Sequence, residues 1–113
     1  MAAVAEKQHW VEIGALTDIP VLGARVVQTP QGDIAVFRNT ADEVFALRDQ
    51  CPHQGGPLSQ GIVHGQSVTC PLHGWCIGLG DGRALAPDEG DTPRYPVEVR
   101  DDTVYLCLGA ENP

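Results

Sequence analysis

Four side chains in two short segments have the types and the spacing of a metal site. Cys51 and His53 are separated by one proline, and Cys70 and His73 are separated by proline and leucine. Sixteen residues lie between His53 and Cys70. Thiolate and imidazole ligands select zinc or iron rather than magnesium or calcium. Structural zinc sites usually pair like ligands as C-x2-4-C and H-x3-5-H. The mixed pairs favour two irons, with both cysteines on one and both histidines on the other; a Cys2His2 zinc scaffold is the alternative.

These four residues carry the ligand pattern of the Rieske [2Fe–2S] proteins, and the chain resembles that family along most of its length. The resemblance implies one [2Fe–2S] cluster per chain, with Cys51 and Cys70 on one iron and His53 and His73 on the other. It also implies an all-β fold in which two antiparallel sheets form a base sandwich and a small loop-rich subdomain, about residues 49–78, holds the cluster. We expect residues 1–113 to form one such domain.

Glycines surround the four predicted ligands. Gly55, Gly56 and Gly74 stand where backbone N–H groups could approach negatively charged sulfides without obstruction from a side chain. Plain turn formation is the competing interpretation for each of them.

The chain departs from the respiratory branch of the family at informative positions. That branch has a disulfide between the two loops, but the corresponding residues here are Gly56 and Leu72. It also places serine and tyrosine hydroxyls near the sulfurs, where this chain has Trp75 and Ile77. Fewer hydrogen bonds to the cluster lower its reduction potential. The resemblance therefore implies a low-potential ferredoxin type.

Longer runs resemble the small subunit of assimilatory NAD(P)H-dependent nitrite reductase. They comprise residues 51–65, 68–73, 86–90, 95–99 and 104–106. This resemblance implies that the chain is an electron carrier without a substrate site of its own. It would act with a large subunit that holds FAD, a [4Fe–4S] centre and sirohaem and reduces nitrite to ammonia. The alternative is a free-standing Rieske ferredoxin that delivers electrons to an aromatic-ring dioxygenase.

The remaining candidates favour structural roles. His64 is interpreted as a solvated turn residue, and His9 lies near the N-terminus, away from the motif. Cys76 and Cys107 occur in apolar, strand-like segments and are interpreted as buried inert thiols.

The elements that must position the ligands are short strands. Thirteen glycines and nine prolines interrupt the chain too often for long helices. Alternating or β-rich segments predict strands at Trp10–Gly14, Ala24–Thr29, Asp33–Asn39, Glu43–Arg48, Trp75–Leu79, Arg94–Arg100 and Thr103–Leu108. Residues 51–75 are expected to form a loop-built site without regular elements.

Composition and charge limit the classes of partner and the cellular compartment that we expect. Seven basic residues stand against fifteen acidic ones, for a formal net charge of −8, which disfavours binding to nucleic acid. No apolar run approaches the ~20 residues of a membrane helix. The first residues lack the pattern of a signal peptide. We therefore expect a cytoplasmic protein with reduced cysteines.

Overall fold

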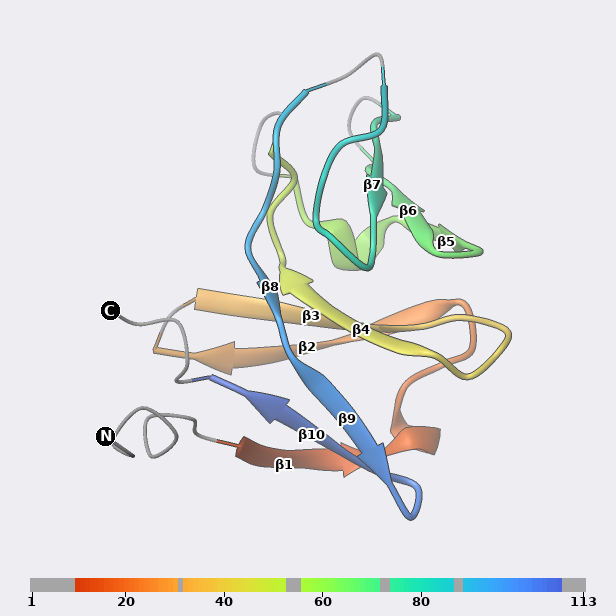
Figure 1. The fold of residues 1–113 in the computed structure, drawn as a ribbon, viewed down its shortest axis with the longest axis vertical. Helices are drawn as coiled ribbons and strands as arrows, with labels where there is room; N and C mark the ends of the chain where they lie inside the picture. The colour runs from red at the N-terminus through yellow and green to blue at the C-terminus, as the bar shows by residue number, and fades with distance from the viewer. Residues whose placement is uncertain (1–9, 31, 53–55, 72–73, 87–88, 109–113) are drawn as a thin grey trace, which may run out of the picture.

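The computed structural model describes residues 10–30, 32–52, 56–71, 74–86 and 89–108, and this part of the chain folds into three antiparallel sheets (Figure 1). The all-β prediction is confirmed. Sheet A has the order β1-β10-β9, from β1 (Trp10–Ala15), β9 (Val97–Arg100) and β10 (Thr103–Cys107). Sheet B has the order β2-β3-β4-β8, from β2 (Gly23–Thr29), β3 (Gly32–Arg38), β4 (Val44–Arg48) and β8 (Arg94–Tyr95). Sheet C has the order β5-β6-β7, from β5 (Ile62–His64), β6 (Ser67–Thr69) and β7 (Cys76–Gly78).

Two short 3-10 helices complete the described elements. The first, η1 (Leu16–Asp18), follows β1, and the second, η2 (Leu58–Gln60), precedes β5. Leu58 of η2 is fully buried in the same hydrophobic cluster as the inner side chains of sheet C. We call η2 and sheet C together the sheet C subdomain; it lies above sheet B in Figure 1.

Sheet B is the middle layer of the molecule, and the sequence of β3 shows why. Ile34, Ala35, Val36 and Phe37 are all fully buried. Successive side chains of a strand point to opposite faces, so both faces of β3 are covered. Ile34 and Val36 pack in the core shared with sheet A. Ala35 and Phe37 pack in the core shared with the sheet C subdomain. A four-residue apolar run is therefore what a strand covered on both faces requires.

Pro96 divides the strand predicted at Arg94–Arg100 into two strands in different sheets, which corrects that prediction. Tyr95 in β8 pairs with Ala46 of sheet B, whereas Val97 in β9 pairs with Leu106 of sheet A. Proline lacks the N–H that a continuous ladder would need. The chain therefore passes from one sheet to the other at this residue and ties the two layers of the base together.

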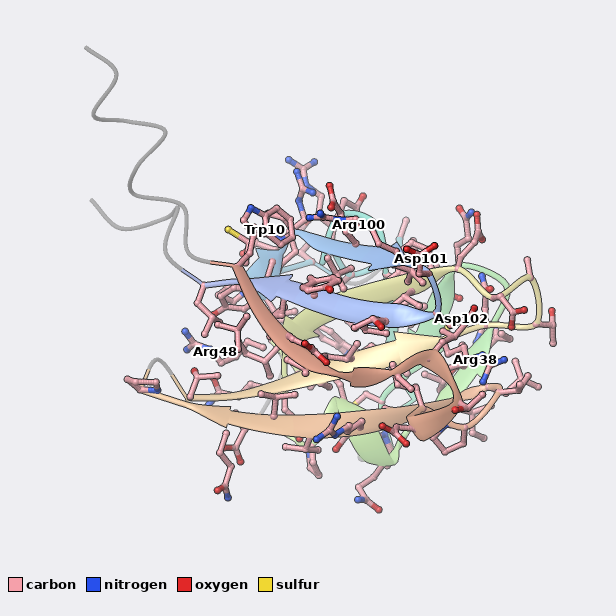
Figure 2. The ribbon with its side chains drawn as sticks, turned by 90° about the horizontal axis from the view of Figure 1, so that it is seen from below. Trp10, Arg38, Arg48, Arg100, Asp101 and Asp102 are labelled. Atoms are coloured by element: carbon pink, nitrogen blue, oxygen red, sulfur yellow. The ribbon has the colours of Figure 1, made fainter. Side chains whose placement is uncertain are left out.

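The β9–β10 hairpin closes through a two-residue turn, as predicted. Asp101 and Asp102 both have positive φ, 51° and 64°, the backbone geometry of a type I′ turn (Figure 2). Arg100 at the same end lies over the ring of Tyr105, 5.0 Å from its centroid.

The expectation that residues 51–75 lack regular elements was wrong. This part of the chain contributes η2, β5 and β6, and Val63 pairs with Val68 across the two strands. Both valines are buried, at 3% and 0% exposure. Three-residue strands give too little alternation to be recognised as strands from the sequence.

No helix among the described residues is long and apolar enough to cross a membrane.

Candidate metal centre

The two loops that carry the predicted ligands are closed in the same way. The Cys51 N–H donates to the Gly56 carbonyl at 2.8 Å, and the Cys70 N–H donates to the Trp75 carbonyl at 2.7 Å. In each loop, the cysteine therefore bonds to the backbone five residues ahead. His53 and His73 belong to these two closed loops but lie outside the described residues. The equivalent closures support a site to which each loop contributes one pair of ligands.

Both predicted cysteine ligands lie in one hydrophobic core. Cys51 is 3% exposed and Cys70 is 2% exposed, and they share a cluster with Leu58, Val68 and Ile77. All four cysteines of the chain are described, and none is in a disulfide. A thiolate buried among apolar side chains is costly unless it coordinates a metal. Two such thiols at the starts of matching loops fit an iron–sulfur cluster, although the described residues alone hold only half of the predicted ligand set.

The glycines beside the ligands have different roles. Gly74 has a φ of +74°, which favours glycine, and its N–H donates to the Cys70 carbonyl at 3.1 Å. That bond supports the turn interpretation for Gly74. Gly56 is buried and closes the first loop through its carbonyl. Gly55 lies outside the described residues.

Asp49 and Ser59 hold the two ends of the first ligand loop together. The Ser59 N–H donates to Asp49 Oδ1 at 2.7 Å, and the Ser59 hydroxyl donates to Oδ2 at 2.8 Å. The carboxylate thereby caps an N–H at the start of η2, which has no partner inside so short a helix. This pair was not predicted from the sequence, although an acid two residues before a predicted ligand was an available signal.

A third segment packs against both ligand loops. A side-chain carbon at Gly90 would lie 3.2 Å from Pro52 Cβ and 3.9 Å from Trp75 Cζ3. The absence of a side chain at Gly90, whose φ is +132°, allows this close approach. Pro87, which the family resemblance assigns to a loop that covers the cluster, lies outside the described residues.

Asn39 connects the base to the sheet C subdomain on another side. Its Nδ2 donates to Glu43 Oε1 at 2.8 Å and to the Gly65 carbonyl at 3.0 Å, and the side chain is 4% exposed, as a satisfied amide can be. Gln66 also donates to Glu43 Oε1, at 3.2 Å. The hydrogen bond from Asn39, with a smaller contribution from Gln66, lowers the pKa of Glu43 below its ordinary value of 4.5.

His64 and Cys76, which the sequence did not favour as ligands, have surroundings that the sequence did not indicate. His64 ends a strand rather than occupying a turn, and its Nε2 lies 2.7 Å from Thr69 Oγ1. The same hydroxyl lies 3.5 Å from Cys76 Sγ, so Cys76 is a partly buried, hydrogen-bonded thiol rather than a fully buried one. Cys107 is 1% exposed, which confirms it as a core thiol.

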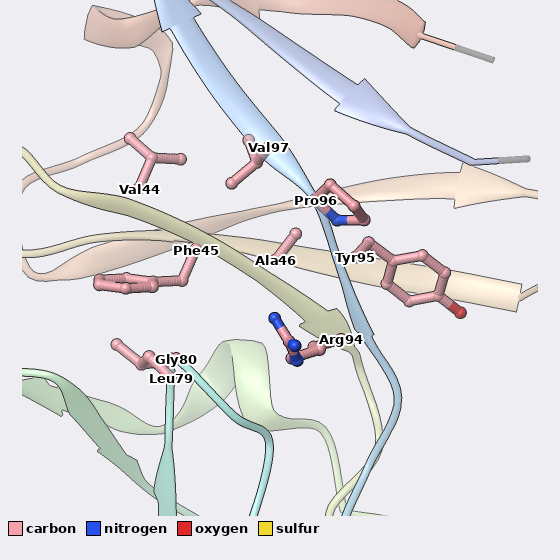
Figure 3. A pocket seen from close by; sticks show the side chains of 9 residues that line it. All are labelled: Val44, Phe45, Ala46, Leu79, Gly80, Arg94, Tyr95, Pro96 and Val97. Atoms are coloured by element: carbon pink, nitrogen blue, oxygen red, sulfur yellow. The ribbon is translucent and has the colours of Figure 1, made fainter. Parts of the chain in front are cut away.

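A pocket of about 260 Å³ opens where β4 and the β8–β9 segment separate (Figure 3). The Arg94 guanidinium lies inside it, whereas the Tyr95 hydroxyl points away and accepts from Arg48. The residues that line the pocket are Val44, Phe45, Ala46, Leu79, Gly80, Arg94, Tyr95, Pro96 and Val97. Neither Cys51 nor Cys70, the two predicted ligands that the structure describes, is among these residues.

Comparison with known proteins gives one family and several relatives. The Rieske [2Fe-2S] domain matches residues 9–96. The ferredoxin component of the naphthalene 1,2-dioxygenase/salicylate 5-hydroxylase systems of Ralstonia sp. is 30% identical over 102 residues, which cover 89% of this chain and 97% of that protein. The 4beta-methylsterol monooxygenase of Methylococcus capsulatus is 54% identical over 88 residues, and the match spans 68% of this chain but only 24% of the monooxygenase.

Solved structures give the same architecture. A complex of reduced oxygenase and oxidised ferredoxin in carbazole 1,9a-dioxygenase contains a chain that matches with a TM-score of 0.77 at 26% identity, covering 92% of this chain and 95% of that one. A protein assigned as an NADH-dependent nitrite reductase small subunit from Mycobacterium tuberculosis matches with a TM-score of 0.81 at 23% identity, covering 89% and 96%. At 23% identity, the second likeness shows a common fold alone.

Proposed function

This chain belongs to the Rieske [2Fe-2S] domain family, and from that premise we propose that it is a free-standing ferredoxin that passes electrons from a reductase to an oxygenase. One observation carries the proposal. Relatives that match this chain over 94–97% of their own length, at 30–34% identity, include ferredoxin components of naphthalene and anthranilate dioxygenase systems. The match over nearly the whole length of these ferredoxin components supports the role of an electron carrier.

We assign the cluster to the four residues that the sequence indicated. Cys51 and Cys70 would hold one iron, and His53 and His73 would hold the other, within a cluster-binding subdomain of about residues 49–78. The burial of the two thiols and the matching closures of the two loops support the assignment. When bound, the cluster supplies reversible one-electron transfer.

The residues of the chain itself have three tasks in this function. The apolar side chains around Cys51 and Cys70 exclude water from the thiolates. The Asp49–Ser59 pair fixes the first ligand loop, and Gly90 lets the third segment pack against both loops. These contacts at the ends of the loops would limit how far the predicted ligands move when the cluster gains or loses an electron.

The small-subunit role in nitrite reductase is the second candidate. It rests on the sequence runs that resemble that subunit and on a shared fold with the Mycobacterium tuberculosis protein. The full-length relatives at 30% identity or more favour the ferredoxin role instead.

Electron delivery to purified acceptors tests whether the chain serves an oxygenase or a nitrite reductase. The reduced protein is mixed anaerobically with an aromatic-ring oxygenase component and, separately, with a sirohaem nitrite reductase large subunit, and its reoxidation is followed by visible absorbance. We expect each equivalent of this chain to lose one electron and the oxygenase to gain one. Oxidation by the nitrite reductase subunit alone would replace the proposal with the second candidate.

A further inference from the structure

The pocket between β4 and the β8–β9 segment lies where Pro96 takes the chain from one sheet to the other. Before that point, β8 pairs with only two residues of β4, Ala46 and Leu47. Val44 and Phe45, at the start of β4, have no residue of β8 opposite them. The pocket of about 260 Å³ opens at this incompletely paired edge, as Figure 3 shows.

The walls of the pocket are apolar and come from both hydrophobic cores. Phe45 and Leu79 pack in the core shared with the sheet C subdomain, whereas other wall residues pack in the core shared with sheet A. These others include Val44, Ala46 and Val97. Ala46 and Leu79 are each 2% exposed, and the remaining three are half-buried. The packing behind these side chains holds them in place, so the apolar surface is already formed without a ligand.

One charged side chain projects between these walls. The Arg94 guanidinium lies inside the pocket in Figure 3, and Arg94 is exposed, so a solute can reach it. Within the described part of the chain, this guanidinium makes no hydrogen bond or ion pair with another residue. By contrast, Arg48 donates to the Tyr95 hydroxyl, and Arg38 pairs with Asp42. The N–H donors of Arg94 are therefore available to a ligand.

A guanidinium beside apolar walls selects a particular class of ligand. Its planar fork of N–H donors matches the two oxygens of a carboxylate, which accept both bonds at once. One positive charge balances a monoanion, whereas a phosphate would bring further negative charge to a chain of net charge −8. The apolar walls suit an apolar body, and the volume is below that of sites for drug-sized ligands. The matching ligand is a small monocarboxylic acid with an aromatic or branched aliphatic body.

We propose that this pocket binds a small apolar monocarboxylate, with its carboxylate on Arg94 and its body against Phe45, Leu79 and Val97. Such a ligand contacts β4 and β9 together and connects sheets A and B beside the residue at which the chain crosses between them. The proposal goes beyond electron transfer and does not rest on it, because binding is measured without any electron acceptor.

Titration of the oxidised protein with benzoate at constant ionic strength, followed by ¹H–¹⁵N NMR, tests the site. We expect saturable shifts of the backbone amide signals of Val44, Ala46 and Val97, with a Kd on the order of 1 mM for so small a ligand. Arg94→Gln should weaken binding about tenfold, because it removes the charge-assisted hydrogen bonds. Benzyl alcohol, which has the ring without the carboxylate, should bind the wild type and Arg94→Gln equally weakly.

Arg83→Gln is the matched control, since Arg83 is also exposed but does not line the pocket. This variant should bind benzoate like the wild type. Thermal unfolding gives a second measurement: benzoate at ten times its Kd should raise the Tm of the wild type by about 5 °C and leave that of Arg94→Gln nearly unchanged. Equal benzoate affinity in the wild type and Arg94→Gln, an equal loss in Arg83→Gln, or shifts that do not saturate would overturn the site.

Discussion

Cys51 and Cys70 differ from the other two cysteines in what surrounds them. They begin two loops with the same backbone closure and share one core, whereas Cys76 contacts a threonine hydroxyl on the outer face of sheet C and Cys107 is buried in β10. Burial alone therefore does not mark a ligand, because Cys107 is as inaccessible as Cys70.

Substitution of single residues tests the ligand assignment. We expect Cys70→Ser, His53→Ala and His73→Ala each to abolish cluster assembly, because the cluster needs all four ligands. Cys76→Ser keeps a group able to bond the Thr69 hydroxyl and should retain full loading. The measurement is iron and acid-labile sulfide per chain, in equal amounts in the wild type. A colourless wild type with one zinc would contradict the assignment and support the zinc scaffold.

The ligand assignment could be proposed from the sequence because the candidate residues are adjacent in sequence and chemically specific. Few other arrangements explain two mixed Cys/His pairs sixteen residues apart. Asp49 and Ser59 could not be recognised in the same way, since both are common surface residues whose relation appears only when the loop between them closes. The contact of Thr69 with His64 and Cys76 likewise depends on strands too short to predict.

At the level of elements, the Asp49–Ser59 pair links β4 to η2 around the first ligand loop. A double-mutant cycle with Asp49→Ala and Ser59→Ala should give a coupling free energy of about 1–2 kcal/mol in urea unfolding, because the Ser59 hydroxyl donates to a charged carboxylate that is only partly buried. The bond from the Ser59 backbone N–H survives in Ser59→Ala and does not enter this coupling. Gln60→Ala, on the exposed side of η2, should change the free energy of unfolding by less than about 0.5 kcal/mol. Additive effects of the two alanine substitutions would show that the bond between the Ser59 hydroxyl and the Asp49 carboxylate contributes nothing to stability.

The Asn39–Glu43–Gln66 contacts join the β3–β4 hairpin to the β5–β6 turn and make that connection sensitive to acid. The pKa of Glu43 is lower in the folded protein than its ordinary value, so ionised Glu43 favours the folded state. Its contribution is fully present above pH 4.5 and is lost as the pH falls through the folded-state pKa. Chemical unfolding at pH 6 and at pH 3.5 should show a smaller difference between the two pH values for Glu43→Gln than for the wild type. An identical pH dependence in the two proteins would rule out this role.

Most strands were predictable, and the exceptions have physical causes. The run from Ile34 to Phe37 indicated a strand whether one face or both were covered, but only the structure shows that it separates two cores. Pro96 was visible in the sequence, yet a proline also fits a bend within one edge strand. Its role as the crossing between two sheets depends on which strands lie nearby, and that is a property of the whole fold.

For the molecule as a whole, the surroundings of the predicted cluster imply a low reduction potential. Trp75 and Ile77 have no hydroxyl to donate, and the hydroxyls of Ser59 and Thr69 are already engaged with Asp49, His64 and Cys76. We expect a midpoint potential near the low end of the Rieske range, ~−150 mV, and independent of pH around neutrality. Protein-film voltammetry provides the value. A couple well above zero, or a slope with pH near 7, would show that other groups stabilise the reduced state.

Pulsed electron paramagnetic resonance of the reduced protein tests the central claim most directly, because it detects the ligand nuclei themselves. If His53 and His73 bind one iron, the spectrum contains couplings to two histidine nitrogens, and the signal disappears when either residue is replaced by alanine. A reduced iron–sulfur signal without strongly coupled nitrogen, or the absence of any such signal in a zinc-containing protein, would contradict a Rieske centre built by these two loops.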